Sequence, residues 1–321
     1  MPAGMRVINI VRSLIAGNYR TLPGVGSSLK SRRDAPPPLF IERFTNQIDF
    51  QSHRARANEE IAARRQCERK LASSERQFKT SGFCFVCQRW SEFVSSWDFA
   101  YPVQGHLQVN WREQLFCPHC RLNNRMRASV HLLAQVVSPS RNSHIYVTEQ
   151  STPLYRHLQE RFPMLKGSEY LEDGTALGQR NSAGLRNEDS TQLSFPDAYF
   201  DVLLTFDVFE HIADHRAAFA ECARVLRCGG RMLFSVPFDA AAPRNQVRAR
   251  VGRDGKIEHL LAPEYHEHPR NPEGSLCFQR FGWEMFAQLQ QAGFRNVWAL
   301  CYYSPEYGYL GSEQLQFLAE K

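Results

Sequence analysis

The sequence predicts an α/β protein with a mostly parallel sheet, preceded by a helical arm and a small cysteine module. Three observations carry this prediction. From about residue 140, short apolar stretches typical of strands alternate with stretches typical of helices. Two CxxC motifs precede that alternation, and a segment rich in Ala, Glu, Arg and Gln precedes the motifs. We place the arm at residues 1–80, the module at 81–124 and the α/β domain at 125–321.

Composition narrows the class of protein before any motif is considered. The chain has 321 residues, 43% of them hydrophobic and 22% charged, which suits a soluble globular protein. Its longest apolar runs are only as long as a strand, so no membrane span is expected. Residues 1–80 hold 15 Lys/Arg against 7 Asp/Glu, a net charge of +8, whereas the remainder holds 24 against 26, a net charge of −2. The basic character therefore belongs to the arm.

The basic arm fits either an anionic partner or a solvated helix. No aromatic residues are interleaved with the basic ones between Arg54 and Arg76, which favours the solvated helix. Residues 18–38 are rich in Gly, Pro and Ser and predict a linker, and residues 52–78 predict a helix.

The first residues of the arm predict a short docking helix, with an interfacial membrane helix as the alternative. Arg12 interrupts the apolar stretch and no clean cleavage site follows, so a secretory signal is not expected and a cytoplasmic location is. Five apolar side chains fall on one face of this helix: Val7, Ile10, Val11, Leu14 and Ile15.

The cysteine module predicts a structural zinc site of four thiolates. Cys84 and Cys87 form one CxxC knuckle, Cys117 and Cys120 form the other, and 29 residues (88–116) separate them. Four cysteine ligands leave no open coordination position, so the metal would be structural. The stretches SEFVSSW and HLQVNW alternate and predict a pair of strands between the knuckles. His119 lies inside the second knuckle and is expected to be a bystander.

The α/β domain is expected to start with a strand at 145–149 and to end with two strands that pair antiparallel, because their connection is short. An insertion at about 238–281 precedes the last helix and is long enough to form a lid. The other elements expected in chain order are a helix at 153–162, strands near 166–171 and 185–188, a strand at 201–206, a helix at 214–226, a turn at 228–230, a strand at 231–236, a helix at 283–292 and strands at 296–301 and 315–319.

Polar and ionisable groups follow directly after the apolar strand at 201–206. Asp207, Glu210 and His211 come after the carboxyl end of this strand, and Thr205 is its second-to-last residue. In open α/β sheets, ligands bind outside the carboxyl ends of the strands. These residues therefore predict a ligand cleft at that edge of the sheet.

The surrounding sequence, EDSTQLSFPDAYFDVLLTFDVFEHIADHRAAFAECARVLRCGGRMLFSVPF (188–238), resembles the class I S-adenosylmethionine-dependent methyltransferases of the small-molecule type. The resemblance is specific over about 185–237 and looser over 144–300. It implies a Rossmann-like, seven-stranded sheet, S-adenosylmethionine as the cofactor, and direct in-line transfer of a methyl group. A small-molecule acceptor, such as a sugar or a biosynthetic intermediate, is expected. A nucleic-acid methyltransferase and a non-catalytic binding protein are the alternatives.

The resemblance implies seven cofactor-binding residues: Glu149, Glu169, Asp189, Ser190, Thr205, Phe206 and Asp207. Asp189 and the Ser190 backbone would bracket the adenine, and Glu169 would bind the ribose, with Glu172 and Asp173 as alternates. Residues 205–207 would line the methionine end of the cofactor. Glu149 would keep the role of the acid that ends the first strand, although Gln150–Thr152 stand where the family has a Gly-x-Gly turn.

The candidate catalytic residues are histidines and a tyrosine. The resemblance places His211 near the point of methyl transfer, and the insertion supplies His259, Tyr265, His266 and His268. A general base is useful when the acceptor is a hydroxyl or a protonated amine, and these side chains can serve as one. Phe281 and Trp283 are expected to pack beneath the lid, and Arg270 and Arg280 to be solvated charges.

Overall fold

The computed structural model describes residues 35–103, 105–267 and 271–321. The expected docking helix, most of the expected linker at 18–38, His268 and Arg270 lie outside these residues. No helix in the described part of the chain is long and apolar enough to cross a membrane.

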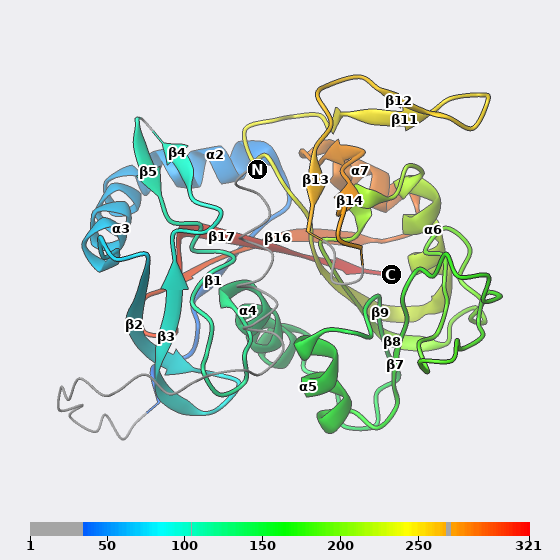
Figure 1. Ribbon diagram of the computed structural model, residues 1–321, viewed down its shortest axis with the longest axis horizontal. Helices are drawn as coiled ribbons and strands as arrows, with labels where there is room; N and C mark the ends of the chain where they lie inside the picture. The colour runs from blue at the N-terminus through cyan, green and yellow to red at the C-terminus, as the bar shows by residue number, and fades with distance from the viewer. Residues whose placement is uncertain (1–34, 104, 268–270) are drawn as a thin grey trace.

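One seven-stranded sheet forms the centre of the molecule (Figure 1). Its strands run in the order β1 (Ile41–Phe44), β16 (Asn296–Ser304), β17 (Tyr309–Glu320), β9 (Leu226–Ser235), β8 (Phe200–Phe206), β6 (Ile145–Val147) and β7 (Leu165–Gly167). The pairing is parallel from β7 through β6 and β8 to β9, and antiparallel from β9 through β17 and β16 to β1. The expected antiparallel pairing of the last two strands, β16 and β17, is confirmed. The sheet is therefore mixed: β7, β6, β8, β9 and β16 run in one direction and β17 and β1 in the other, so most strands share a direction although half of the pairings are antiparallel.

The seventh strand comes from an unexpected part of the sequence. β1 belongs to the basic arm, and it pairs with β16 at the edge of the sheet. The strand expected at 185–188 is instead reduced to two isolated bridges, one between Glu169 and Asn187 and one between Arg180 and Arg186. That stretch is polar and is preceded by Gly178 and Gly184, both at positive φ, so this part of the chain forms turns rather than a ladder. The expected turn at 228–230 lies inside β9, where Gly229 has a φ of 75°.

Helices cover both faces of the sheet, as expected. On one face α2 (Gln47–Arg56), α6 (His215–Val225) and α7 (Glu284–Gln291) bury Phe50, Phe219 and Phe286 against the strands. On the other face α4 (Asn124–Leu132), which continues into η1 (Leu133–Val137), and α5 (Pro153–Arg161) bury Val130 and Leu154. Burial of such apolar area is the main stabilising contribution to this three-layer arrangement.

The expected helix at 52–78 is divided and ends early. α2 ends at Arg56 and α3 spans Asn58–Leu71, whereas Phe78 lies in β2 (Gln77–Cys84). Side chains of β2 alternate between exposed and buried from Gln77 to Gly82, which is the period of a strand.

The cysteine module is built on the hairpin of β2 and β3 (Arg89–Ser96), beside the shorter hairpin of β4 (Tyr101–Val103) and β5 (His106–Gln108). Figure 1 shows both hairpins on the opposite side of the molecule from α6. SEFVSS and HLQ do form strands, but they pair with β2 and β4 and not with each other. The reason is that β2 supplies a further alternating strand, which was not expected and whose first two residues, Gln77 and Phe78, fall within the predicted helix.

The insertion at 238–281 forms three small two-stranded sheets. β11 (Ala249–Val251) and β12 (Ile257–His259) form a hairpin that projects from the molecule (Figure 1). β13 (Tyr265–His266) pairs with β14 (Ser275–Leu276), and β10 (Gln246–Val247) pairs with β15 (Gln279–Arg280). Phe281 and Trp283 are buried beneath the insertion, as expected.

Candidate functional site

Acidic residues follow three neighbouring strands at one edge of the sheet. Glu149 follows β6, Glu169 follows β7, and Asp207 follows β8. Because β6 pairs in parallel with both β7 and β8, the carboxyl ends of all three strands meet at this edge. The structure therefore brings together three of the four acids that the sequence predicts around the cofactor.

Glu169 holds the loop that stands in place of a glycine turn. Its Oε1 accepts hydrogen bonds from the backbone N–H of Gln150 at 2.8 Å, from the N–H of Ser151 at 2.7 Å and from the Ser151 hydroxyl at 2.7 Å. Its Oε2 has no partner in the described part of the chain, so this oxygen is available to a ligand. The loop is thus ordered by a carboxylate rather than by glycine conformations.

At Gly167, the last residue of β7, the backbone lies very close to α5 and to the residue that follows β6. A Cβ atom at this position would lie 2.3 Å from the Tyr155 ring and 2.7 Å from the Glu149 carbonyl oxygen. Any other residue at 167 would displace either the start of α5 or the end of β6, and a glycine is therefore required here.

Glu149 is held among other charges. Burial raises the pKa of its carboxyl to about 7, and the negative charges of Glu169 and Asp207 act in the same direction. The Thr152 side chain and Arg125 oppose this shift. Near neutral pH this group is therefore poised between its neutral and ionised forms.

Asp207 is fixed by two arginines and a serine. Its Oδ1 lies 2.7 Å from Nη2 of Arg112 and accepts the Ser235 hydroxyl at 2.8 Å, and its Oδ2 lies 3.1 Å from Nε of Arg125. Burial alone would raise the pKa of this carboxyl, but the two guanidinium groups hold it well below its usual range. Its φ of 54° turns the chain sharply where β8 ends.

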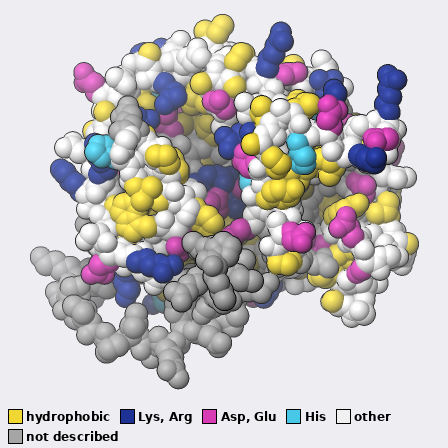
Figure 2. All heavy atoms as spheres, turned by 45° about the horizontal axis from the view of Figure 1, so that its top comes forward, with side chains coloured by type: hydrophobic (Ala, Val, Ile, Leu, Met, Phe, Trp, Pro, Cys, Tyr) yellow, Lys and Arg dark blue, Asp and Glu magenta, His cyan; other side chains and the backbone are white. Residues whose placement is uncertain are grey.

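Glu113 completes this charge cluster. Arg125 donates to it from Nε at 3.0 Å and from Nη2 at 3.3 Å, Asn123 donates at 2.9 Å, and Arg112 also contacts it. Figure 2 shows a hollow between the two halves of the molecule with basic and acidic side chains on its floor. Arg112, Glu113 and Arg125 were missed by the sequence analysis, because nothing in their local sequence marks them as partners of Asp207.

The remaining expected cofactor residues differ in exposure. Asp189 accepts the N–H of Thr191 at 2.8 Å and its hydroxyl at 2.7 Å through Oδ1, and both Asp189 and Ser190 are half-buried. Thr205 is fully buried within β8, and Phe206 is 9% exposed. Of residues 205–207, Asp207 is therefore the one whose side chain reaches the edge.

Of the four expected catalytic residues that the structure describes, two lie together. The rings of His211, in η2 (Phe209–His211), and His266, in β13, have centroids 5.0 Å apart. The buried carboxylate of Glu210 lies close to both rings. The backbone carbonyl oxygen of Glu210 accepts a hydrogen bond from the backbone N–H of Phe278 at 2.7 Å. His259 is exposed on the projecting hairpin, and Tyr265 is 56% exposed. The structure does not bring these two residues to the strand ends.

The four cysteines of the two CxxC knuckles converge. Sγ of Cys84 lies 3.7 Å from Sγ of Cys120, Sγ of Cys87 lies 3.8 Å from Sγ of Cys117, and all four sulfur atoms lie within 4.8 Å of one another. Tetrahedral zinc with Zn–S bonds of about 2.3 Å requires sulfur atoms about 3.8 Å apart. The thiols therefore fit a tetrahedral ion. His119 is exposed and lies outside the cluster.

Comparison with known proteins supports the class suggested by the sequence. Residues 156–234 match the family model described as a methyltransferase domain. A probable S-adenosylmethionine-dependent methyltransferase of Mycolicibacterium smegmatis is 39% identical over 22% of this chain and 24% of its own length. The 27-O-demethylrifamycin SV methyltransferase of Amycolatopsis mediterranei is 28% identical over 34% of this chain and 46% of its own length. Among solved structures, an S-adenosylmethionine-dependent methyltransferase from Mesorhizobium loti is 15% identical over 60% of this chain and 98% of that one, with a TM-score of 0.38.

Residues 156–234 thus match a methyltransferase domain, and the chain is similar over part of its length to S-adenosylmethionine-dependent methyltransferases, which supports the class predicted from the sequence. It spans less than half the length of each of these two curated relatives.

Proposed function

We propose that this protein transfers a methyl group from S-adenosylmethionine to a small molecule by direct in-line displacement. The observation that carries the proposal is the meeting of Glu149, Glu169 and Asp207 at the carboxyl ends of three adjacent parallel strands. Glu169 and Asp207 lie within the region 156–234 that matches the methyltransferase domain, and Glu149 lies just before it. The relative named for 27-O-demethylrifamycin SV, a small molecule, supports the acceptor class.

Each expected cofactor residue has a role in this proposal. Glu169 would bind the ribose hydroxyls through its free Oε2, because a carboxylate accepts strong hydrogen bonds from neighbouring hydroxyls. Asp189 and the Ser190 backbone would hold the adenine. Arg112 and Arg125, fixed by Asp207, would face the methionine end, where a guanidinium fits the carboxylate of the amino acid. Glu149, Thr205 and Phe206 would form the wall behind it.

The chemistry needs alignment more than a covalent intermediate. Bound S-adenosylmethionine supplies an electrophilic methyl group whose positive charge disperses during the displacement. The protein's part is to align the acceptor with that methyl group and to exclude water. His211 lies just after the end of β8, and the ring of His266, from the insertion, packs against it. We therefore assign to these two residues the removal of a proton from the acceptor. Tyr265 and His259 stay weaker candidates because of their exposure.

We also propose that the four cysteines hold a structural zinc ion. The ion would join the turn between β2 and β3 to the knuckle at 117–120, and the module made rigid in this way carries Arg112. Zinc with four thiolates supplies folding energy and no open position for a substrate.

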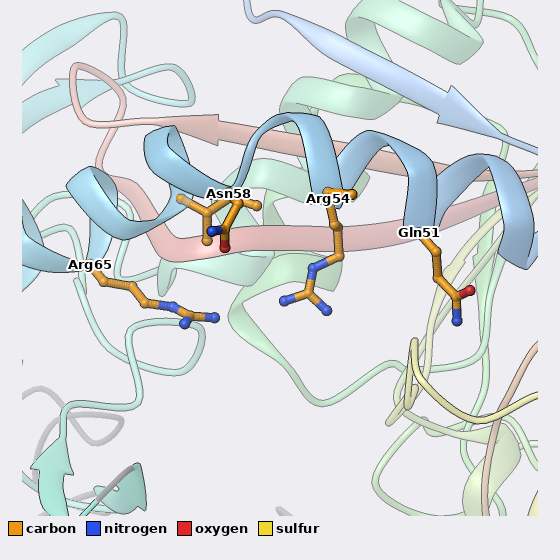
Figure 3. A pocket seen from close by; sticks show the side chains of 6 residues that line it. Gln51, Arg54, Asn58 and Arg65 are labelled. Atoms are coloured by element: carbon orange, nitrogen blue, oxygen red, sulfur yellow. The ribbon is translucent and has the colours of Figure 1, made fainter.

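A nucleic-acid acceptor is the second candidate, and the basic segment is the feature that would favour it. A shallow hollow runs along α2 and α3, and the side chains of Arg54 and Arg65 point into it (Figure 3). However, Nε of Arg54 lies 3.0 Å from Glu313, and Arg64 is paired with Glu60 and lies over the Tyr303 ring. Part of the basic charge is thus used inside the fold, which supports the small-molecule acceptor.

The test is calorimetric titration of the full chain with S-adenosylmethionine and with its demethylated product. We expect saturable binding of both and a rise in melting temperature. Neither heat nor a thermal shift would favour the non-catalytic alternative. Steep salt dependence of RNA binding, together with methyl transfer to RNA, would favour the nucleic-acid alternative.

A further inference from the structure

We propose that Glu210, His211 and His266 form a binding site for a divalent cation of the zinc type, separate from the four cysteines. One nitrogen of each histidine lies close to the same carboxylate oxygen: Nδ1 of His266 is 3.6 Å and Nε2 of His211 is 3.7 Å from Oε1 of Glu210. The three ligand atoms all lie within 4.8 Å of one another.

The hydrogen bonds of the two imidazoles leave the correct nitrogen free in each. Nδ1 of His211 lies 2.8 Å from the carbonyl oxygen of Leu276, which can only accept, so the proton of a neutral ring is on Nδ1. Nε2 of His266 lies 3.1 Å from Oε1 of Glu264, which places that ring's proton on Nε2. Each neutral ring therefore presents a bare lone pair toward Glu210, as a metal ligand does.

The burial of Glu210 is a second, independent observation in favour of a cation site. Its side chain is fully buried, and neither carboxylate oxygen has a hydrogen-bond partner among the described residues. A buried carboxylate without a hydrogen-bond partner is costly, and while both rings are neutral their bare nitrogens add repulsion. Glu210 and Glu264 both raise the pKa of His266, so an ion pair with protonated His266 is the alternative that the test separates from a bound cation. A divalent cation between the three groups would remove both costs at once.

The separations suit such an ion. Bonds of about 2.0–2.2 Å in a tetrahedral arrangement place ligand atoms roughly 3.4 Å apart. The observed 3.6 and 3.7 Å require contraction by only a few tenths of an ångström.

The supporting shell has the form seen around metal-binding histidines. Glu264, which receives the His266 proton, is held by Nη2 of Arg280 at 2.8 and 2.9 Å and by Nε of Arg248 at 3.2 Å. Glu264, His266 and Cys277 also lie close together, but these arginines occupy Glu264, and Cys277 donates to the Gln279 carbonyl at 3.2 Å. Glu264 is therefore the orienting carboxylate and not a ligand.

Three protein ligands leave one coordination position open, which is typical of zinc sites that bind substrate. Resting on the proposed methyl transfer, that position would take the acceptor's hydroxyl oxygen and favour loss of its proton to solvent before the oxygen attacks the methyl carbon. The carbon–sulfur bond would then break with its electron pair going to sulfur. With an ion bound, His211 and His266 would act as its ligands, and this role would replace the proton-accepting role assigned to them under the proposed function.

The test counts zinc per chain in full-length protein after reconstitution with Zn²⁺ and gel filtration. Wild type is expected to hold about two equivalents, and Glu210→Gln and His266→Ala about one. His259→Ala, which removes an exposed histidine of the same insertion, should keep about two. The second equivalent should bind equally in chain that has not been given S-adenosylmethionine, so its presence is independent of the methyltransferase proposal.

Two results would overturn the site. One is a wild type that holds a single equivalent, lost in Cys117→Ser and kept in Glu210→Gln. The other is an unchanged zinc content in both Glu210→Gln and His266→Ala, which would mean that a protonated Glu210 or an ion pair with His266 satisfies this cluster. Absence of S-adenosylmethionine binding with two zinc ions present would instead overturn the proposed function alone.

Discussion

Nε of Arg125 lies 3.1 Å from Oδ2 of Asp207 and joins the helix that follows the cysteine module to the end of the central strand β8. Arg112, from the module itself, holds the other oxygen of the same carboxylate. The module is therefore tied electrostatically to the strand end where we place the cofactor. We therefore expect a substitution at the strand end to alter the stability of the module, and the reverse.

Substitution of Asp207 tests this connection. Asp207→Asn keeps the shape of the side chain but leaves Arg112 and Arg125 without their shared counter-charge. We expect the free energy of unfolding to fall by roughly 2–4 kcal/mol, less than for a fully buried pair because the three side chains are 12–30% exposed. Urea unfolding measures the loss.

Asp197→Asn is the matched control for that substitution. Asp197 also pairs with an arginine, Arg224, but its side chain is 79% exposed. A surface pair of this kind contributes roughly 0–1 kcal/mol. Equal losses in the two variants would show that the Asp207 cluster is no more important than a surface pair.

A second prediction concerns pH. The folded-state pKa of Glu149, about 7, is above the value of about 4.3 for an unfolded chain. The stability contributed by its protonated form is therefore complete below about pH 4.3 and is lost as pH rises through 7. Glu149→Gln is neutral at every pH, so this variant should be more stable than wild type at pH 8, by roughly 1–2 kcal/mol after allowance for partial exposure, and nearly equal to it at pH 5.

Melting temperatures between pH 5 and 8, measured without cofactor, check this prediction. Glu160→Gln, on the exposed side of α5, should follow the wild-type curve throughout. If Glu149→Gln also follows that curve, then Glu149 is ionised normally in the folded protein.

Local pattern was sufficient for most of the sheet and for the acids at its edge. The strand at β8 and the helices α5, α6 and α7 lie within a residue or two of their predicted bounds, because apolar periodicity and capping residues are local signals. The convergence of the four cysteines could also be predicted, because CxxC spacing itself brings pairs of thiols together.

Contacts between distant segments could not be predicted in this way. Arg125 meets Asp207, and β1 joins β16, only because the chain folds back on itself, and no property of the short stretch Ile41–Phe44 specifies its partner. His266 was singled out as one of several histidines in the insertion. Its separation from His259 into different hairpins depends on the pairing of β13 with β14, which the sequence pattern does not specify.

A third prediction concerns the zinc ion proposed at the four cysteines. Cys84→Ser should abolish one equivalent of zinc and lower the melting temperature, because Cys84 is fully buried and its sulfur faces that of Cys120. Cys67→Ser, which changes an exposed free cysteine of α3, should alter neither quantity. If Cys84→Ser keeps its zinc, the four thiols are only packed side chains.

The last prediction tests which acid at the end of β7 binds the ribose. Glu169→Gln keeps an amide oxygen that can accept the N–H groups of Gln150 and Ser151, so the loop should stay ordered. The charged acceptor for the ribose hydroxyls is lost, and hydrogen bonds to a charged group contribute about 1.5–3 kcal/mol. We therefore expect calorimetric titration to show affinity for S-adenosylmethionine reduced roughly 10- to 100-fold, with an unchanged melting temperature. Glu172→Gln, an exposed acid three residues further on, should bind as wild type does, and the reverse pattern would move the ribose site from Glu169 to Glu172.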